Sequence, residues 1–307
     1  MKKQIITSII GLILIISVFL LLDIKSVINI LIKTNIYYFV LAGFFYLLME
    51  MGNVLKLKIA TNLPFKKMIL SNFAGMFLSQ LTPGKSGYMY TAYSIGKKTN
   101  TSSSKNLGRL ALIQGMMMIT KIITLIIAFV YFSFIFEIPL YLYLTFTVPI
   151  IVIVLIILFL YTQISNRLIS KIPLLKKVNK YLKLMQRAVK KISSKKLLKF
   201  LIIDIFLFLI IGFQFYFLSL ALNININYFT ALFLQPILTT LMLIPLSPNA
   251  LGITEGGNSI LFVLLGFNPA VGASFAFLLR INTIVFDSIG ILDLKNLKIP
   301  KLKNYLN

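Results

Sequence analysis

The stretch Pro245-Leu-Ser-Pro-Asn-Ala-Leu-Gly-Ile-Thr-Glu-Gly-Gly257 interrupts a long hydrophobic run near the C-terminal end of the chain. Its prolines and glycines cannot continue a helix, and Glu255 is unfavourable in hydrocarbon. A broken backbone at membrane depth is tolerated only where it is buried in protein or lines a wet cavity. Such breaks are typical of transporter binding sites. The stretch Leu81-Thr-Pro-Gly-Lys-Ser-Gly87 is similar and predicts a second break.

The composition predicts an all-α, polytopic membrane protein made of one integral membrane domain. The chain is 59% hydrophobic and has a mean hydropathy of +0.94, whereas soluble proteins are about 45–50% apolar. Its 307 residues accommodate about six spans of roughly 20 residues. The absence of His and Cys excludes disulfides, thiolate nucleophiles and Ser-His-Asp triads, and nearly all zinc sites. We therefore expect no catalytic residues, no metal and no cofactor, and a protein that is not an enzyme.

The net charge of +24 would suggest nucleic acid as the partner of a soluble protein. In a membrane protein the positive-inside rule explains such an excess, and anionic lipid headgroups are the expected counter-surface. Most of the 31 basic residues fall in segments that the rule places in the cytoplasm. We therefore predict a multi-pass protein of the cell membrane, with both termini cytoplasmic and no nucleic-acid partner.

The hydrophobic runs and basic loops predict the order of the elements. Spans are expected at 5–22, 36–51, 110–135, 141–161, 200–222 and 269–292. The segment 68–96 lies between two basic loops, so we expect a re-entrant hairpin that enters and leaves on the cytoplasmic side. The segment 228–267 is expected to form the corresponding external hairpin. The halves 36–135 and 200–292 then share one layout in opposite orientations, which is the inverted-topology pattern of many transporters.

Proline and glycine residues are expected to turn the two hairpins. These residues are Pro83, Gly84 and Gly87 in the first hairpin, and Pro245, Pro248, Gly252, Gly256 and Gly257 in the second. The connector 162–199 has apolar residues at alternating spacings of three and four, and basic residues on its other faces. It reads as an amphipathic helix on the inner leaflet, or as a helix docked on its own membrane domain.

Four charged residues are predicted at membrane depth and are the candidate substrate-binding residues: Lys85, Lys121, Glu255 and Arg280. A charge facing lipid is unfavourable by several kcal/mol, so each should point into the protein or a wet cavity. Three cations against one anion predict a positive interior that suits a lipid phosphate.

Structural alternatives stay open for each of these four residues. Glu255 and Arg280 would also fit a structural ion pair, Lys121 would fit a contact with a carbonyl group, and a shallower hairpin would place Lys85 in the cytoplasm. Three acids receive no binding role. Asp204 and Asp287 are interpreted as helix-end residues, with a contribution to a cytoplasmic gate as the alternative, and Glu50 is interpreted as interfacial.

The residues around the two breaks resemble a known family. Pro245-x-Ser-Pro-x-x-x-Gly-x-x-Glu255, followed by Leu264-Leu-Gly266, Ala273 and Arg280, is similar to the C-terminal signature of a flippase-like integral membrane domain. That domain occurs in lysylphosphatidylglycerol synthases and as stand-alone bacterial and archaeal proteins. Thr82-Pro-Gly-x-x-Gly87 resembles its N-terminal signature.

The chain also departs from the family pattern. The family usually has Glu after the second glycine and Arg three residues later, where this chain has Tyr88 and Thr91. A Glu-Arg pair common early in the following span is not evident around Gln114.

The resemblance implies movement of a polar-headed lipid between leaflets. The expected cargo is an anionic or aminoacylated phospholipid or a polyprenyl-phosphate-linked lipid, and membrane lipids are the expected partners. Because the soluble synthase domain is not present in this sequence, lysine transfer by this chain is not expected. The alternatives are a non-catalytic membrane subunit that presents lipid to a separate aminoacyl- or glycosyltransferase, and a lipid-binding scaffold.

Overall fold

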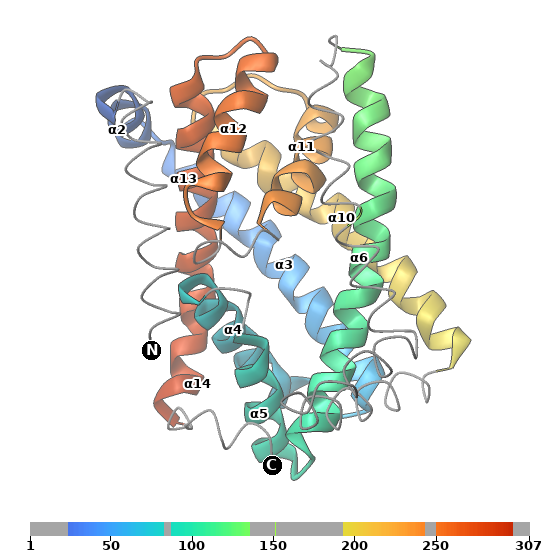
Figure 1. The fold of residues 1–307 in the computed structure, drawn as a ribbon. Coiled ribbons are helices and arrows are strands. Elements are labelled where there is room, and N and C mark those ends of the chain that lie inside the picture. The colour runs from blue at the N-terminus through green and yellow to red at the C-terminus, as the bar shows by residue number, and fades with distance from the viewer. Residues whose placement is uncertain (1–23, 83–86, 136–150, 152–192, 243–249, 297–307) are drawn as a thin grey trace, which may run out of the picture.

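The computed structural model describes residues 24–82, 87–135, 151, 193–242 and 250–296 (Figure 1). Several predicted features lie outside these residues: the spans at 5–22 and 141–161 (apart from 151), most of the connector 162–199, Lys85, and the hairpin residues Pro83, Gly84, Pro245 and Pro248.

Every element in the described part of the chain is helical. The helices are α2 (Ile24–Ile32), α3 (Ile36–Thr61), α4 (Phe65–Leu81), α5 (Gly87–Thr99), α6 (Ser103–Ser133), α10 (Ser194–Ala221), α11 (Tyr228–Leu241), α12 (Ile253–Leu264), α13 (Pro269–Asp287), the 3-10 helix η4 (Ser288–Gly290) and α14 (Ile291–Asn296). Among these residues, four stretches are long and apolar enough to cross a membrane: Ile36–Thr61, Ser103–Ser133, Ser194–Ala221 and Pro269–Lys295. The all-α, multi-pass prediction is confirmed at this level.

The helices α3 and α10 cross the middle of the molecule and pack against each other (Figure 1). Phe45 stacks on Phe213 and Phe217, with ring centroids 5.0 and 5.4 Å apart. The helix α3 continues well beyond the predicted end of its span at residue 51. Lys56, which we had expected in a cytoplasmic loop, is therefore helical and fully buried.

The first broken segment forms two helices, α4 and α5, that pack against each other. Their close approach depends on Gly87, because a Cβ there would lie 1.9 Å from the carbonyl oxygen of Gly75 and 2.5 Å from Ser79 Oγ. Any larger residue would push the two helices apart. The sequence prediction that Gly87 helps form this hairpin therefore has a steric basis.

The second segment contains α11, which ends at Leu241, and α12, which begins at Ile253. Asn227 caps α11, where its side chain accepts a hydrogen bond from the Thr230 amide at 2.8 Å. Gly252 precedes α12 with φ of 87°, a conformation that favours glycine. In Figure 1, α4 and α5 occupy the lower half of the molecule and α11 and α12 the upper half.

Two clusters of buried apolar residues support the two broken segments separately. One contains residues from α11 and α12 with the adjoining parts of α3, α6, α10 and α13. The other contains residues from α4 and α5 with the remaining parts of α3, α6 and α10. Each broken segment thus has its own core, and α3, α6 and α10 pass through both.

Replacing Gly87 by alanine should lower the free energy of unfolding by about 1–3 kcal/mol, because the new Cβ meets rigid backbone. Denaturant titration in detergent micelles measures the loss. The matched control is Gly257→Ala, whose Cβ would lie 2.2 Å from the mobile Cδ1 of Leu241. An equal loss in both variants would contradict the steric role of Gly87.

Candidate functional site

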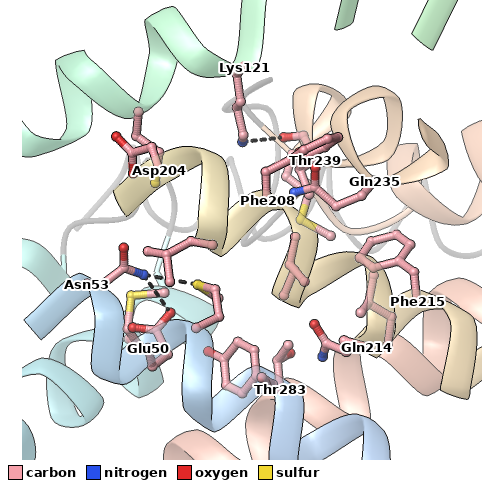
Figure 2. Close-up of a pocket in the computed structure, with 18 of the residues that line it drawn as sticks. Glu50, Asn53, Lys121, Asp204, Phe208, Gln214, Phe215, Gln235, Thr239 and Thr283 are labelled. Atoms are coloured by element: carbon pink, nitrogen blue, oxygen red, sulfur yellow. Dashed lines mark hydrogen bonds between the residues drawn. The ribbon is translucent and has the colours of Figure 1, made fainter. Parts of the chain in front are cut away.

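A cavity of about 180 Å³ lies where the broken segments meet the long helices (Figure 2). Its polar lining comes from seven helices. The residues that matter most for its chemistry are Tyr46, Glu50 and Asn53 of α3, Ser79 and Gln80 of α4, Tyr88 of α5, Lys121 of α6, Asp204 and Gln214 of α10, Gln235 and Thr239 of α11, and Arg280 of α13. Because both broken segments contribute, a group in the cavity would contact both.

Lys121 is one of the predicted substrate-binding residues that the cavity contains. It lies on α6, and its Nζ donates a hydrogen bond to the Thr239 carbonyl of α11 at 3.5 Å (Figure 2). Thr239 lies near the end of α11, where carbonyl groups carry partial negative charge. Lys121 thus joins a span to the second broken segment and lines the cavity.

Arg280 and Glu255 form an ion pair, in which Arg280 Nη2 lies 2.9 Å from Glu255 Oε1. The same Nη2 donates to Thr254 Oγ1 at 2.9 Å. Glu255 Oε2 accepts hydrogen bonds from the Gly252 amide at 2.6 Å and from the Thr254 hydroxyl at 2.9 Å. Arg280 lines the cavity, whereas Glu255 is buried behind it. Glu255 therefore caps the N-terminus of α12 and joins α12 to α13.

All five acidic residues in the described part of the chain are buried: Glu50, Asp204, Glu255, Asp287 and Asp293. The sequence prediction of a positive interior with a single acid is therefore wrong. Sequence reasoning placed Asp204 and Asp287 at helix ends and Glu50 at the interface, and it gave Asp293 no role. The signal that would have found Glu50 and Asp204 is their position inside apolar runs, where a carboxylate marks a functional site by default.

Glu50 and Asp287 connect α4 to the long helices through neutral side chains. Glu50 Oε2 accepts from Asn72 Nδ2 at 2.7 Å. Asp287 Oδ1 accepts from the Tyr46 hydroxyl at 2.7 Å, and its Oδ2 accepts from Gln80 Nε2 at 3.2 Å. The side-chain amides of Asn72 and Gln80 belong to α4. Carboxylates of α3 and α13 therefore hold α4, the first helix of the first broken segment, in place.

Asp204 forms a buried ion pair with Lys56 that joins α10 to α3. At the far end of the first broken segment, Asp293 of α14 pairs with Lys98 of α5. Ser94 also donates to Asp293 Oδ2, at 2.6 Å. Buried carboxylates thus connect each broken segment to the long helices and to the C-terminal helix.

The profile of the lysylphosphatidylglycerol synthase TM region matches residues 6–290. The chain belongs to this family. A search of curated proteins gives no significant match. The family is associated with membrane lipids, and several apolar transmembrane helices of this chain are present in the structure.

The structure describes both residues that depart from the family pattern. Tyr88 lines the cavity, and its side chain lies close to that of Gln114 of α6. Thr91 is buried, and its hydroxyl donates to the Gly87 carbonyl at 3.5 Å. A contact between neutral side chains thus joins α5 to α6 where the family usually has charged residues.

Replacing Glu255 by alanine should lower the free energy of unfolding by about 3–5 kcal/mol, because it removes the carboxylate that compensates the partly buried guanidinium of Arg280. In the Glu255→Ala background, Arg280→Ala should lower the free energy of unfolding by less than it does in the wild-type background. A double-variant cycle measured by denaturant titration gives this coupling. Additive losses would show that the ion pair does not anchor α12.

Proposed function

We propose that this protein is a lipid flippase or transporter rather than an enzyme, and that the cavity receives the lipid headgroup. Its cargo would be an anionic or aminoacylated phospholipid or a polyprenyl-phosphate-linked lipid. The observation that carries the proposal is one cavity lined by both broken segments and by two cations, Lys121 and Arg280.

The arrangement of the broken segments supports alternating exposure of this cavity. The cavity is lined by α4 and α5, which lie in the lower half of the molecule in Figure 1, and by α11, which lies in the upper half. With the first broken segment re-entrant from the cytoplasm and the second from outside, the halves form an inverted repeat. Transporters of this design place the substrate at the repeat interface and move one half against the other.

The chemistry of the cavity wall supports a lipid headgroup as its occupant. Lys121 offers a point charge on one side, and Gln235 and Thr239 offer neutral polar groups beside it (Figure 2). Met49, Leu207 and Phe208 supply apolar surface in the same cavity. A phosphate would bind the lysine, whereas the glycerol or prenyl carbons would contact the apolar wall.

The outer surfaces of the long helices support a lipid environment around this cavity. Many large apolar side chains are exposed on these helices: Val40, Phe44 and Leu48 on α3, Ile123, Ile126, Ile127 and Val130 on α6, Ile202, Ile205 and Phe206 on α10, and Ile281 and Val285 on α13. A lipid can therefore keep its acyl chains against these surfaces while its headgroup occupies the cavity.

Replacing Lys121 by glutamine should slow lipid movement about tenfold, because a hydrogen bond to a charged group contributes about 1.5–3 kcal/mol. The assay uses proteoliposomes that contain fluorescent short-chain phosphatidylglycerol. A quencher added outside reports how much of this lipid is accessible from outside, and the change of this fraction with time gives the rate of lipid movement. The control is Lys295→Gln, since Lys295 is exposed and does not line the cavity.

Two results would count against different parts of this proposal. The transport function would be contradicted if the wild-type protein moved none of three lipids faster than empty liposomes do. These lipids are phosphatidylglycerol, its lysyl ester and a polyprenyl phosphate. Active wild type with an equally active Lys121→Gln variant would leave transport standing and remove Lys121 from the headgroup site.

A further inference from the structure

Three side chains that line the cavity each carry a buried oxygen with no hydrogen-bond partner among the described residues. These oxygens are Asn53 Oδ1 of α3, Asp204 Oδ2 of α10 and Thr239 Oγ1 of α11. Figure 2 shows Thr239 beside Lys121, with Asn53 and Asp204 on the other side of the cavity. Buried polar atoms are almost always hydrogen-bonded, so three exceptions around one cavity point to a group that the cavity receives.

The unpartnered oxygens of Asn53 and Asp204 are acceptors on side chains that are otherwise engaged. Asn53 Nδ2 donates to Met49 Sδ at 3.1 Å and to Glu50 Oε1 at 3.4 Å, which leaves the amide oxygen. Asp204 Oδ1 accepts from Lys56, and the side chain of Asp204 is only 3% exposed. The oxygens of an ionised phosphate are acceptors too, so they cannot satisfy these two atoms. The two oxygens therefore require a donor elsewhere in the headgroup.

The hydroxyl of Thr239 differs from the other serine and threonine hydroxyls that line the cavity. Each of the others donates to a backbone carbonyl of its own helix: those of Ser79, Thr120, Thr124 and Thr283. The neighbouring Thr240 does the same, since its hydroxyl donates to the Pro236 carbonyl at 2.6 Å. Thr239 Oγ1 makes no such bond in this part of the chain, so it can both donate to and accept from a ligand.

We propose that Asn53, Asp204 and Thr239 bind the hydroxyl groups of a polyhydroxylated lipid headgroup. A hydroxyl group is both a donor and an acceptor, so it matches the two acceptors and the threonine hydroxyl alike. An ammonium group only donates, and it would leave the proton of the Thr239 hydroxyl unused. A headgroup with several hydroxyl groups can contact side chains from three helices at once.

Two kinds of headgroup have this chemistry, a glycerol and a sugar. In either one the phosphate would bind Lys121, as in the proposed function, and the hydroxyl groups would distinguish this headgroup from others with the same charge. The inference rests on the proposed function for the cavity as a headgroup site. The preference for hydroxyl groups is nevertheless measurable without transport.

The test measures the thermal unfolding midpoint of the purified full chain in detergent as soluble phosphate esters are titrated. One arm compares glycerol phosphate with propyl phosphate, and the other compares glucose 1-phosphate with cyclohexyl phosphate. The two members of each pair have the same charge and a similar size, and they differ in their hydroxyl groups. We expect the wild type to bind the hydroxylated member of at least one pair about tenfold more tightly, because the other member leaves buried oxygens unpaired.

Three variants remove the proposed contacts. Thr239→Val removes the hydroxyl but keeps the backbone carbonyl that accepts from Lys121, and Asn53→Leu removes the amide oxygen. Lys56→Met with Asp204→Leu removes a buried ion pair as a whole, so that no charge is left uncompensated. Each variant should lower the preference for the hydroxylated ester about threefold or more. The affinity for propyl phosphate and cyclohexyl phosphate should stay unchanged.

The matched control is Thr240→Val. It makes the same substitution one position further along α11, at a buried threonine that does not line the cavity and whose hydroxyl is bonded to its own helix. This control should keep the wild-type preference.

Each outcome assigns or removes the site. A preference within the glycerol pair alone assigns a glycerol headgroup, and one within the ring pair alone assigns a sugar. The proposal is overturned if the wild type shows no preference in either pair, or if Thr239→Val and Asn53→Leu both keep it. Tighter binding of phosphorylethanolamine than of both hydroxylated esters also overturns it in favour of an ammonium group. A hydroxyl preference in protein that moves no lipid would keep the site while the transport function fails.

Discussion

A helix that begins away from water leaves backbone amides that only protein groups can satisfy. At the start of α12 this is achieved by Glu255, which accepts the Gly252 amide at 2.6 Å and pairs with Arg280 at 2.9 Å. The carboxylate alone would be a buried charge, and the guanidinium compensates it. One interaction therefore satisfies the broken backbone, fixes α12 against α13 and places Arg280 in the cavity wall. The cavity depends on this junction because Arg280 is part of the cavity lining.

The same physical solution recurs wherever a broken segment meets a long helix. Asp287 accepts hydrogen bonds from Tyr46 and Gln80, and Asp293 accepts one from Ser94 and pairs with Lys98. In an interior with little water these bonds have no competing donors, so they fix the position of short helices that apolar contacts alone would let slide. Packing between apolar residues is not directional, whereas the hydrogen bonds of a carboxylate with two partners are directional. The five acids in the described part of the chain thus each connect one helix to another.

The sequence predicted the helices because hydrophobic runs, prolines and glycines act locally. The helices α4, α5, α11 and α12 flank the two predicted breaks, and the predicted spans 36–51, 110–135, 200–222 and 269–292 overlap the long helices. The predicted spans 5–22 and 141–161 lie outside the described residues, apart from residue 151. The ion pair of Lys56 with Asp204 was not predicted, because the two residues lie 148 positions apart and only tertiary packing brings them together. Counting basic residues by the positive-inside rule assigned Lys56 to a loop, since the rule takes each lysine as exposed unless an acid partner is known. The Glu255–Arg280 ion pair was one of two alternatives that the sequence left open, because both charged residues were predicted at membrane depth.

The buried acids also change the electrostatics of the proposed transport. A headgroup has to leave the cavity as readily as it enters, so binding that is too strong would stop the cycle. A cavity with three unopposed cations would hold a phosphate tightly. In the structure Arg280 is opposed by Glu255, and Lys121 is directed at a carbonyl that a phosphate would have to replace. On the proposed function, each cation would exchange one acceptor for another when the headgroup arrives, and the net gain would be smaller than the charge alone suggests. This exchange would allow a strongly basic membrane protein to release an anionic lipid.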